Sequence, residues 1–265
     1  MDHREVGQHW NKIASTWTAM ARAGYDFYRD HFNTPAFMDF LPDVRGLQGL
    51  DIGCGEGYNT RLLAGRGAVM AAIDISEVFV HHAAEIPPER LMIDYGVASA
   101  VRLPFSEITF DFATGFMSFM DIPEIEDVLM EIARVLRPSG FVQFSISHPC
   151  FDTAHRVNLR NREGLTFAIE VGDYFRNLNG EMIEFNKPAS QAAKDGFPLM
   201  RIPRFTRTIS QWINALLDAG LIIERVNEPR PTDEQVQECP GLQDAQVVSY
   251  FLHIRARKPA VSQSG

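Results

Sequence analysis

The stretch LDIGCGEG at residues 50–57 decides the fold, because it places a glycine-rich turn between an apolar run and a helical pattern. Residues 47–52 are predicted to form a buried strand, and residues 58–65 a helix. The apolar run at residues 68–73 ends at Asp74 and is too short for most helices, so it predicts a second strand, covered on both faces. Such an order is typical of a parallel α/β sheet, whose ligands bind where the strands' carboxyl ends meet these turns.

Strand and helix patterns keep alternating after this turn. Ser76 is a typical N-cap for the next helix, which Pro87 and Pro88 would end. Helices are predicted at residues 58–65, 77–85, 125–136 and around Trp212, the last closed by Gly220. Further strands are predicted at residues 91–98, 110–116, 141–146, 221–226 and 247–254. The fold class is therefore α/β, a parallel sheet with helices on both faces.

The composition matches an ordinary globular protein, with 45% hydrophobic and 22% charged residues among 265. A net charge of −9 argues against nucleic acid as a partner, because that affinity comes largely from Lys and Arg neutralising phosphates. The three cysteines are widely spaced and form no C-x-x-C, which argues against disulfides or zinc and fits a reducing compartment. No secretory or membrane-spanning run is visible, so we expect a cytoplasmic protein without a membrane partner. The oligomeric state stays open.

Two segments lie outside the alternation of strands and helices. Residues 1–40 are helical and aromatic in pattern, and residues 151–207 form a long aromatic insert. A connection of that length is unusual in a compact domain unless it works as a lid or binding loop. We therefore expect both segments to cap the strand ends around a core at residues 41–150, with residues 208–257 completing the sheet and residues 258–265 forming a frayed tail. The alternative is that both simply pack on the sheet.

Two classes of ligand compete for the glycine loop. A dinucleotide fingerprint would read G-x-G-x-x-G, whereas the third glycine here falls one place early. The carboxylates of Asp51 and Glu56 would repel a pyrophosphate, but they suit S-adenosylmethionine (SAM), which is cationic and carries no phosphate. Asp74 ends the second strand, where a carboxylate can accept hydrogen bonds from both ribose hydroxyls. The alternative is a tight turn with capping carboxylates and no ligand.

Four motifs resemble those of a class I SAM-dependent methyltransferase of the type-11, small-molecule kind. They are LDIGCGEG at residues 50–57, AAIDIS at 71–76, RLPF at 102–105 with FDFATGF at 110–116, and ARVLRPSGFVQFSISHP at 133–149. The resemblance implies a Rossmann-like fold with a seven-stranded, mostly parallel sheet whose last strand is antiparallel. It also implies SAM as the cofactor.

The resemblance assigns roles to individual residues. Gly53, Gly55 and Gly57 would hold the methionine end of SAM, and Asp74 would hold the ribose. Ser99 stands where the family usually has an acid beside adenine, so the backbone N–H groups of Ser99 and Ala100 are expected to serve the ring. The other candidate cofactor contacts are Asp51, Cys54, Ile75, Phe116, Tyr25 and Arg29. Tyr25 and Arg29 are expected to close over the cofactor carboxylate, or else only to dock the N-terminal helix.

Methyl transfer mainly requires alignment of the acceptor with the methyl group, but a hydroxyl acceptor usually needs a base as well. His148 is the first candidate base, because it follows the fifth strand and Pro149 restricts its backbone to an extended form. The alternative is that it only bonds a loop carbonyl. Asp121 is the second candidate, and its alternative role is to N-cap the helix at residues 125–136. No metal site is predicted.

The predicted function is SAM-dependent methylation of a small metabolite, most readily on oxygen or nitrogen. The alternatives are a SAM-binding regulator without catalysis and an NAD-type oxidoreductase. Arginines of the insert, such as Arg156, Arg204 and Arg207, are expected either to pair with an anionic substrate group or to lie exposed.

Overall fold

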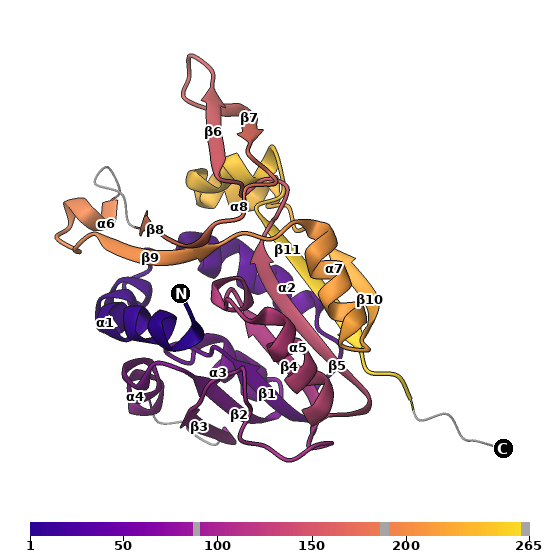
Figure 1. Ribbon diagram of the computed structural model, residues 1–265. Helices are drawn as coiled ribbons and strands as arrows, with labels where there is room; N and C mark the ends of the chain where they lie inside the picture. The colour runs from indigo at the N-terminus through magenta and orange to yellow at the C-terminus, as the bar shows by residue number, and fades with distance from the viewer. Residues whose placement is uncertain (87–90, 186–190, 261–265) are drawn as a thin grey trace.

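The computed structural model describes residues 1–86, 91–185 and 191–260 and contains one central sheet of seven strands (Figure 1). Their order across the sheet is β10-β11-β5-β4-β1-β2-β3. The bounds are β1 Gln48–Ile52, β2 Val69–Asp74, β3 Ile93–Val97, β4 Phe110–Phe116, β5 Leu136–Ser147, β10 Ile222–Asn227 and β11 Phe251–Arg257. Neighbours from β5 to β3 pair in parallel, whereas β11 is antiparallel to both β5 and β10. The predicted sheet, with its antiparallel last strand, is thereby confirmed.

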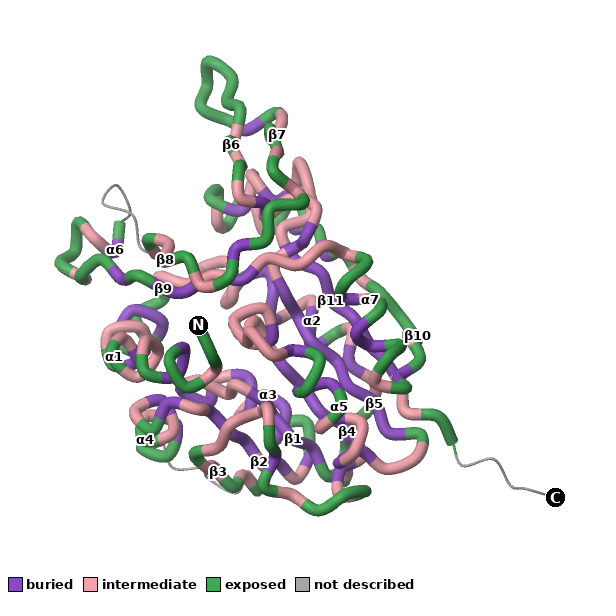
Figure 2. The backbone as a smooth tube through the Cα atoms, in the orientation of Figure 1, coloured by how far each residue is buried: buried purple, intermediate pink, exposed green. Residues whose placement is uncertain are grey.

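Helices cover both faces of this sheet. The strands alternate their side chains, so Ala113 packs toward α5 and α7 while its neighbour Phe112 packs toward α2 and α3. The helix bounds are α2 Thr34–Phe40, α3 Tyr58–Gly65, α4 Glu77–Glu85, α5 Ile125–Val135 and α7 Ile209–Asp218. The prediction that Ser76 caps α4 is confirmed, since its hydroxyl accepts from the Phe79 N–H at 3.2 Å. Figure 2 shows the buried residues concentrated in the central strands.

Several predicted boundaries differ from the structure. The helix predicted to reach Leu136 ends at Val135, and β5 starts at Leu136 rather than at residue 141. Pro138 explains this, because it lacks an N–H and disfavours helical backbone just before it. The last strand begins at Phe251 rather than at residue 247, because the preceding chain turns through the 3₁₀ helix η3, Pro240–Gln246. Pro87, Pro88 and residues 261–265 of the predicted tail lie outside the described residues.

The cap is built from the N-terminal segment and the insert. The N-terminal segment contains α1 His3–Arg22 and the π-helix η1 Arg29–Asn33, followed by α2. The insert folds into two hairpins, β6 His155–Arg160 with β7 Thr166–Gly172 and β8 Asn179–Phe185 with β9 Met200–Phe205, the second carrying α6 Gln191–Lys194. Trp17 of α1 packs on Phe185 of β8, with ring centroids 4.5 Å apart, so α1 and the second hairpin form one cover. The β6–β7 hairpin projects away from the sheet (Figure 1).

The remaining described elements are η2 Phe119–Asp121 and α8 Asp233–Glu238. None of the helices in the described ranges is both long enough and apolar enough to cross a membrane.

Candidate active site

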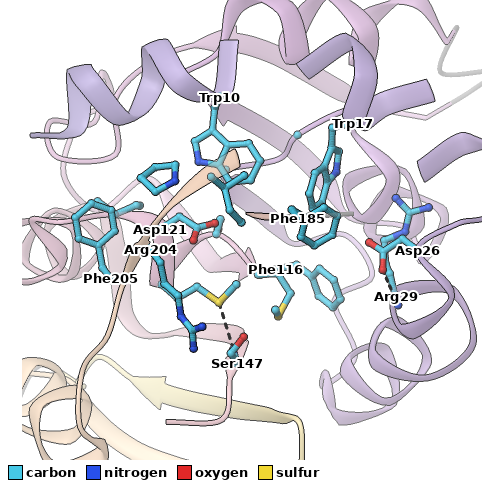
Figure 3. A pocket seen from close by; sticks show the side chains of 18 of the residues that line it. Trp10, Trp17, Asp26, Arg29, Phe116, Asp121, Ser147, Phe185, Arg204 and Phe205 are labelled. Atoms are coloured by element: carbon cyan, nitrogen blue, oxygen red, sulfur yellow. Dashed lines mark hydrogen bonds between the residues drawn. The ribbon is translucent and has the colours of Figure 1, made fainter. Parts of the chain in front are cut away.

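The carboxyl ends of β1, β2 and β4 open into a cavity of about 1090 Å³ beneath the cap. Its lining extends from the glycine loop to aromatic side chains of the cap. Figure 3 shows Trp10, Trp17 and Phe185 on its wall. The aromatic lining includes Trp10, Trp17, Phe116, Phe185 and Phe205. Small-molecule sites usually measure about 300–1,000 Å³, so this cavity has room for a cofactor and a small second molecule together.

The glycine loop folds over the end of β2. Gly53 and Cys54 both donate their N–H groups to the Ile73 carbonyl, at 2.8 and 3.0 Å. Gly53 has a φ of +71°, and a Cβ there would lie 2.4 Å from that of Ser118, so only glycine fits. Gly55 has a φ of +55° and nothing within 4 Å of an added Cβ. The loop therefore leaves an open face toward the cavity.

The Asp74 carboxyl group lines the cavity beside this loop. Its Oδ2 accepts from the Gly55 N–H at 2.9 Å and its Oδ1 from the Ser76 N–H at 2.8 Å. Each oxygen keeps a further lone pair, so the group can also accept from a ligand. Burial raises the pKa of Asp74 to about 6, against the lowering effect of these backbone N–H groups. The charged form therefore becomes dominant only near neutral pH.

Further carboxylates give this end of the cavity an acidic wall. Buried Glu56 is held by the guanidinium of Arg61 at 2.9 Å and by Arg29 at 3.7 Å. Burial raises the pKa of Asp26, which also lines the cavity. Arg29 and Tyr25 line it as well, but Arg29 pairs with Asp30 at 2.7 Å, and the Tyr25 hydroxyl donates to Asp195 at 2.5 Å. Arg22 also pairs with Glu56, at 3.4 Å, whereas among the described residues Asp26 and Asp74 have no cation within ion-pair distance. These two carboxyl groups suit a cation better than a pyrophosphate.

Not every predicted cofactor residue lies on the cavity wall. The lining includes Gly53, Cys54, Gly55, Asp74, Ile75, Ser99, Ala100, Phe116, Tyr25 and Arg29. Asp51 and Gly57 do not line it. Asp51 is buried under the loop, where Thr60 and Thr114 donate their hydroxyls to it, and Gly57 provides the left-handed turn that starts α3. In this structure these two residues therefore shape the loop rather than line the cavity.

Comparisons with known proteins agree with this geometry. A family model described as "Methyltransferase domain" matches residues 50–144. A crystal structure of an S-adenosylmethionine-dependent methyltransferase from Mesorhizobium loti superposes with a TM-score of 0.67 and 27% identity, covering 84% of this chain and 96% of that one. Residues 50–144 therefore match a methyltransferase domain, and the fold is that of the class I SAM-dependent methyltransferases.

Two of the curated relatives have names that state a function. The Ubiquinone biosynthesis O-methyltransferase of Azoarcus is 29% identical over 182 residues, which are 67% of this chain and 72% of the relative. The Biotin biosynthesis bifunctional protein BioHC of Cellvibrio japonicus is 29% identical over 150 residues, 56% of this chain. The match spans only 28% of that bifunctional protein.

The cofactor of this methyltransferase is SAM, and the acidic end of the cavity fits it. SAM supplies a methyl group that its sulfonium already activates. Asp74 would accept from the ribose hydroxyls, and the open face at Gly55 would lie against the methionine portion. The carboxylates nearby complement the positive charge.

Asp74→Ala should weaken the binding of S-adenosylhomocysteine (SAH) by about 1–3 kcal/mol, because it leaves buried polar partners without an acceptor. Titration calorimetry measures this, with Asp94→Ala on exposed β3 as the matched control and NADH as the ligand that should give no signal. An affinity unchanged by Asp74→Ala would remove this carboxylate from the site.

SAH binding should also depend on pH. Ribose hydroxyls donate to the ionised carboxylate, so binding favours loss of the Asp74 proton. The affinity for SAH should increase with pH until about pH 6, by at most about tenfold per pH unit, and should level off above that pH. Calorimetry at pH 5–8 in buffers of different ionisation enthalpy would detect the released proton. Asp74→Asn should flatten this profile, and a slope that persists in that variant would assign the proton to another group.

His148 does not meet the expectation that it faces the acceptor. Its neighbours Ser147 and Pro149 line the cavity, whereas the buried His148 ring does not, because successive side chains of an extended chain alternate. Its Nε2 pairs with Glu228 Oε1 at 2.7 Å, and its Nδ1 accepts from the Cys150 N–H at 3.2 Å. We therefore assign His148 no role as a base.

Asp121 does lie in the cavity, at the end of η2. The N-cap residue of α5 is Glu124, so the alternative role of Asp121 as that cap is not found. Its carboxyl group forms no hydrogen bond or ion pair within residues 1–86, 91–185 and 191–260. Burial raises its pKa to about 8, while Arg204 and Arg207 lower it and Asp152 raises it. Figure 3 shows this carboxyl group between Trp10 and Arg204.

Sequence reasoning placed aromatic residues in the cap without assigning them to the site. Trp10 and Trp17 stand seven positions apart on α1, which puts both on one face of a helix. Their rings meet edge to face, 5.5 Å apart, on the cavity wall. That spacing was a usable signal, whereas nothing in the sequence indicated that Phe185 and Phe205 would belong to one hairpin over the cavity.

Proposed function

We propose that this methyltransferase methylates a hydroxyl or amino group of a small amphipathic molecule bound beneath the cap, with Asp121 as the general base. The observation that carries the proposal is the single cavity that joins the cofactor end to a free carboxyl group among aromatic side chains. Such a pocket excludes water and holds an apolar body against the rings. The Azoarcus relative is named for O-methylation in ubiquinone biosynthesis, and this supports an acceptor of the same kind.

Different residues of the chain would bind the cofactor, align the acceptor and accept the proton. The loop and Asp74 would hold the cofactor, and the aromatic wall would align the acceptor for in-line attack. The Asp121 carboxylate would take the proton from an acceptor hydroxyl as its oxygen bonds to the methyl carbon and the carbon–sulfur bond breaks. The products are the methylated acceptor and neutral SAH. A group with a pKa near the working pH suits this transfer.

The decisive test is transfer of label from methyl-labelled SAM to a metabolite extract, with the product identified by mass. The expected result is a labelled small molecule whose formation requires the protein. A protein that binds SAH but labels nothing would instead support the alternative of a SAM-binding regulator.

The cytoplasmic location expected from the sequence stays a prediction.

A further inference from the structure

The two ends of the cavity differ in their charged side chains, with carboxyl groups prominent at one end and guanidinium groups at the other. The glycine-loop end presents the carboxyl groups of Asp26, Glu56 and Asp74, which suit the cationic cofactor. The cap end presents Arg156 from β6, Arg204 from β9 and Arg207 from the loop after β9. Figure 3 shows Asp26 and Arg204 at opposite ends of the pocket. Binding a cationic cofactor gives no reason for the basic end.

Asp152 holds the Arg204 guanidinium in place and leaves some of its N–H groups free. Its Nη2 donates to the Asp152 carboxylate and to the Asp152 carbonyl, both at 2.6 Å. In the part of the chain that the structure describes, its Nε and Nη1 have no hydrogen-bond partner, and protein does not enclose them. Its side chain lies on the side of the cavity that holds Asp121 (Figure 3). An oriented guanidinium with free donors is a ready site for an oxyanion.

The two neighbouring arginines leave positive charge unbalanced. Among the described residues, neither Arg156 nor Arg207 has a carboxylate within ion-pair distance. Arg156 stacks 4.1 Å over the Tyr250 ring, and its Nε and Nη2 are buried without acceptors. Arg207 donates through Nη2 to two carbonyls, while its Nη1 is buried without a partner, and burial lowers its pKa. Cations held in this way are costly unless an anion balances them.

We propose that the acceptor carries an anionic oxygen group, either a carboxylate or a phosphate. Arg204 binds this group, and the positive charges of Arg156 and Arg207 help to balance its negative charge. This rests on the proposed function, because it takes the space beneath the cap as the acceptor site. The substrate class is then an amphipathic acid. Its apolar body lies against the aromatic wall, its anion lies at Arg204, and its methylated atom lies between Asp121 and the cofactor.

The test separates the metabolite extract into anionic and non-anionic fractions on an anion exchanger before the labelled transfer. The anionic fraction should support methylation and the other fraction should not. Treating the anionic fraction with phosphatase distinguishes the two sources, since loss of acceptor activity indicates a phosphate and its persistence a carboxylate. Transfer only to the non-anionic fraction, with SAH binding intact, would overturn the anion site and leave the proposed function standing. Transfer to no fraction would overturn the proposed function, and the anion site with it.

Arg204→Gln should then raise the KM for the anionic acceptor by about 10- to 100-fold, the usual cost of a lost charged hydrogen bond, with SAH affinity unchanged. Arg204→Lys should recover part of this loss. Arg201→Gln is the matched control, because it removes the same charge from an exposed position of the same strand and does not line the cavity. Equal KM values for Arg204→Gln and Arg201→Gln would contradict the assignment.

Discussion

Asp121→Asn should lower kcat by about 10²- to 10⁴-fold toward a hydroxyl acceptor, the range expected when a general base is lost. The amide keeps the size of the side chain but cannot take a proton. SAH affinity should stay nearly unchanged, because Asp121 lies near Arg204, at the end of the pocket opposite Asp26 and Arg29 (Figure 3). Single-turnover assays with the acceptor found in the extract separate this chemical effect from binding.

The pH profile provides the check on this assignment. Burial raises the pKa of Asp121 to about 8, so below that pH most of the base is protonated and inactive. The wild-type rate should rise with pH and level off near 8, or lower when the nearby sulfonium stabilises the carboxylate. Asp121→Asn should lose this rise, and Asp127→Asn on the exposed face of α5 should keep it. A fast Asp121→Asn enzyme would mean that the acceptor needs no base, as for a neutral amine.

The sheet was predictable because its signals are local. The residues of β4 and α3 match their predicted ranges, since an apolar run or a glycine turn sets each end. The cap was less predictable. The β6–β7 hairpin buries little, and exposed Val157 and Phe167 on it break the alternation that identifies strands in a core. Long-range packing on α1, rather than local pattern, fixes β8 and β9.

For the site, sequence reasoning placed the loop residues where the structure has them, beside the cavity, and misjudged the direction of the His148 side chain. Gly55 and Asp74 follow strand ends, so topology alone brings them together. His148 also follows a strand end, but a shift of one residue along an extended chain turns a side chain away. Arg204 lies far from the motifs in sequence and reaches Asp121 only because β9 packs against η2.

Asp51 offers the sharpest contrast between a residue that contacts the cofactor and one that supports the loop. Its carboxyl group is buried and accepts from Thr60 Oγ1 at 2.5 Å and from Thr114 Oγ1 at 2.8 Å, which ties β1 to α3 and β4. Burial raises its pKa, so the charge itself is costly, whereas the two hydroxyls depend on it as their acceptor.

Asp51→Ala should therefore lower the free energy of unfolding by about 2–4 kcal/mol, because two buried hydroxyls lose their partner while the relief of a buried charge offsets part of the cost. Urea denaturation measures this, and Thr60→Val and Thr114→Val complete double-mutant cycles that should show strong coupling to Asp51. SAH affinity should decrease only moderately, because the substitution affects the cofactor only through increased mobility of the loop that leads into α3. If Asp51→Ala instead abolished SAH binding at full stability, the carboxylate would have to touch the cofactor itself. The loop would then have to open on ligand binding to expose the buried Asp51 carboxylate.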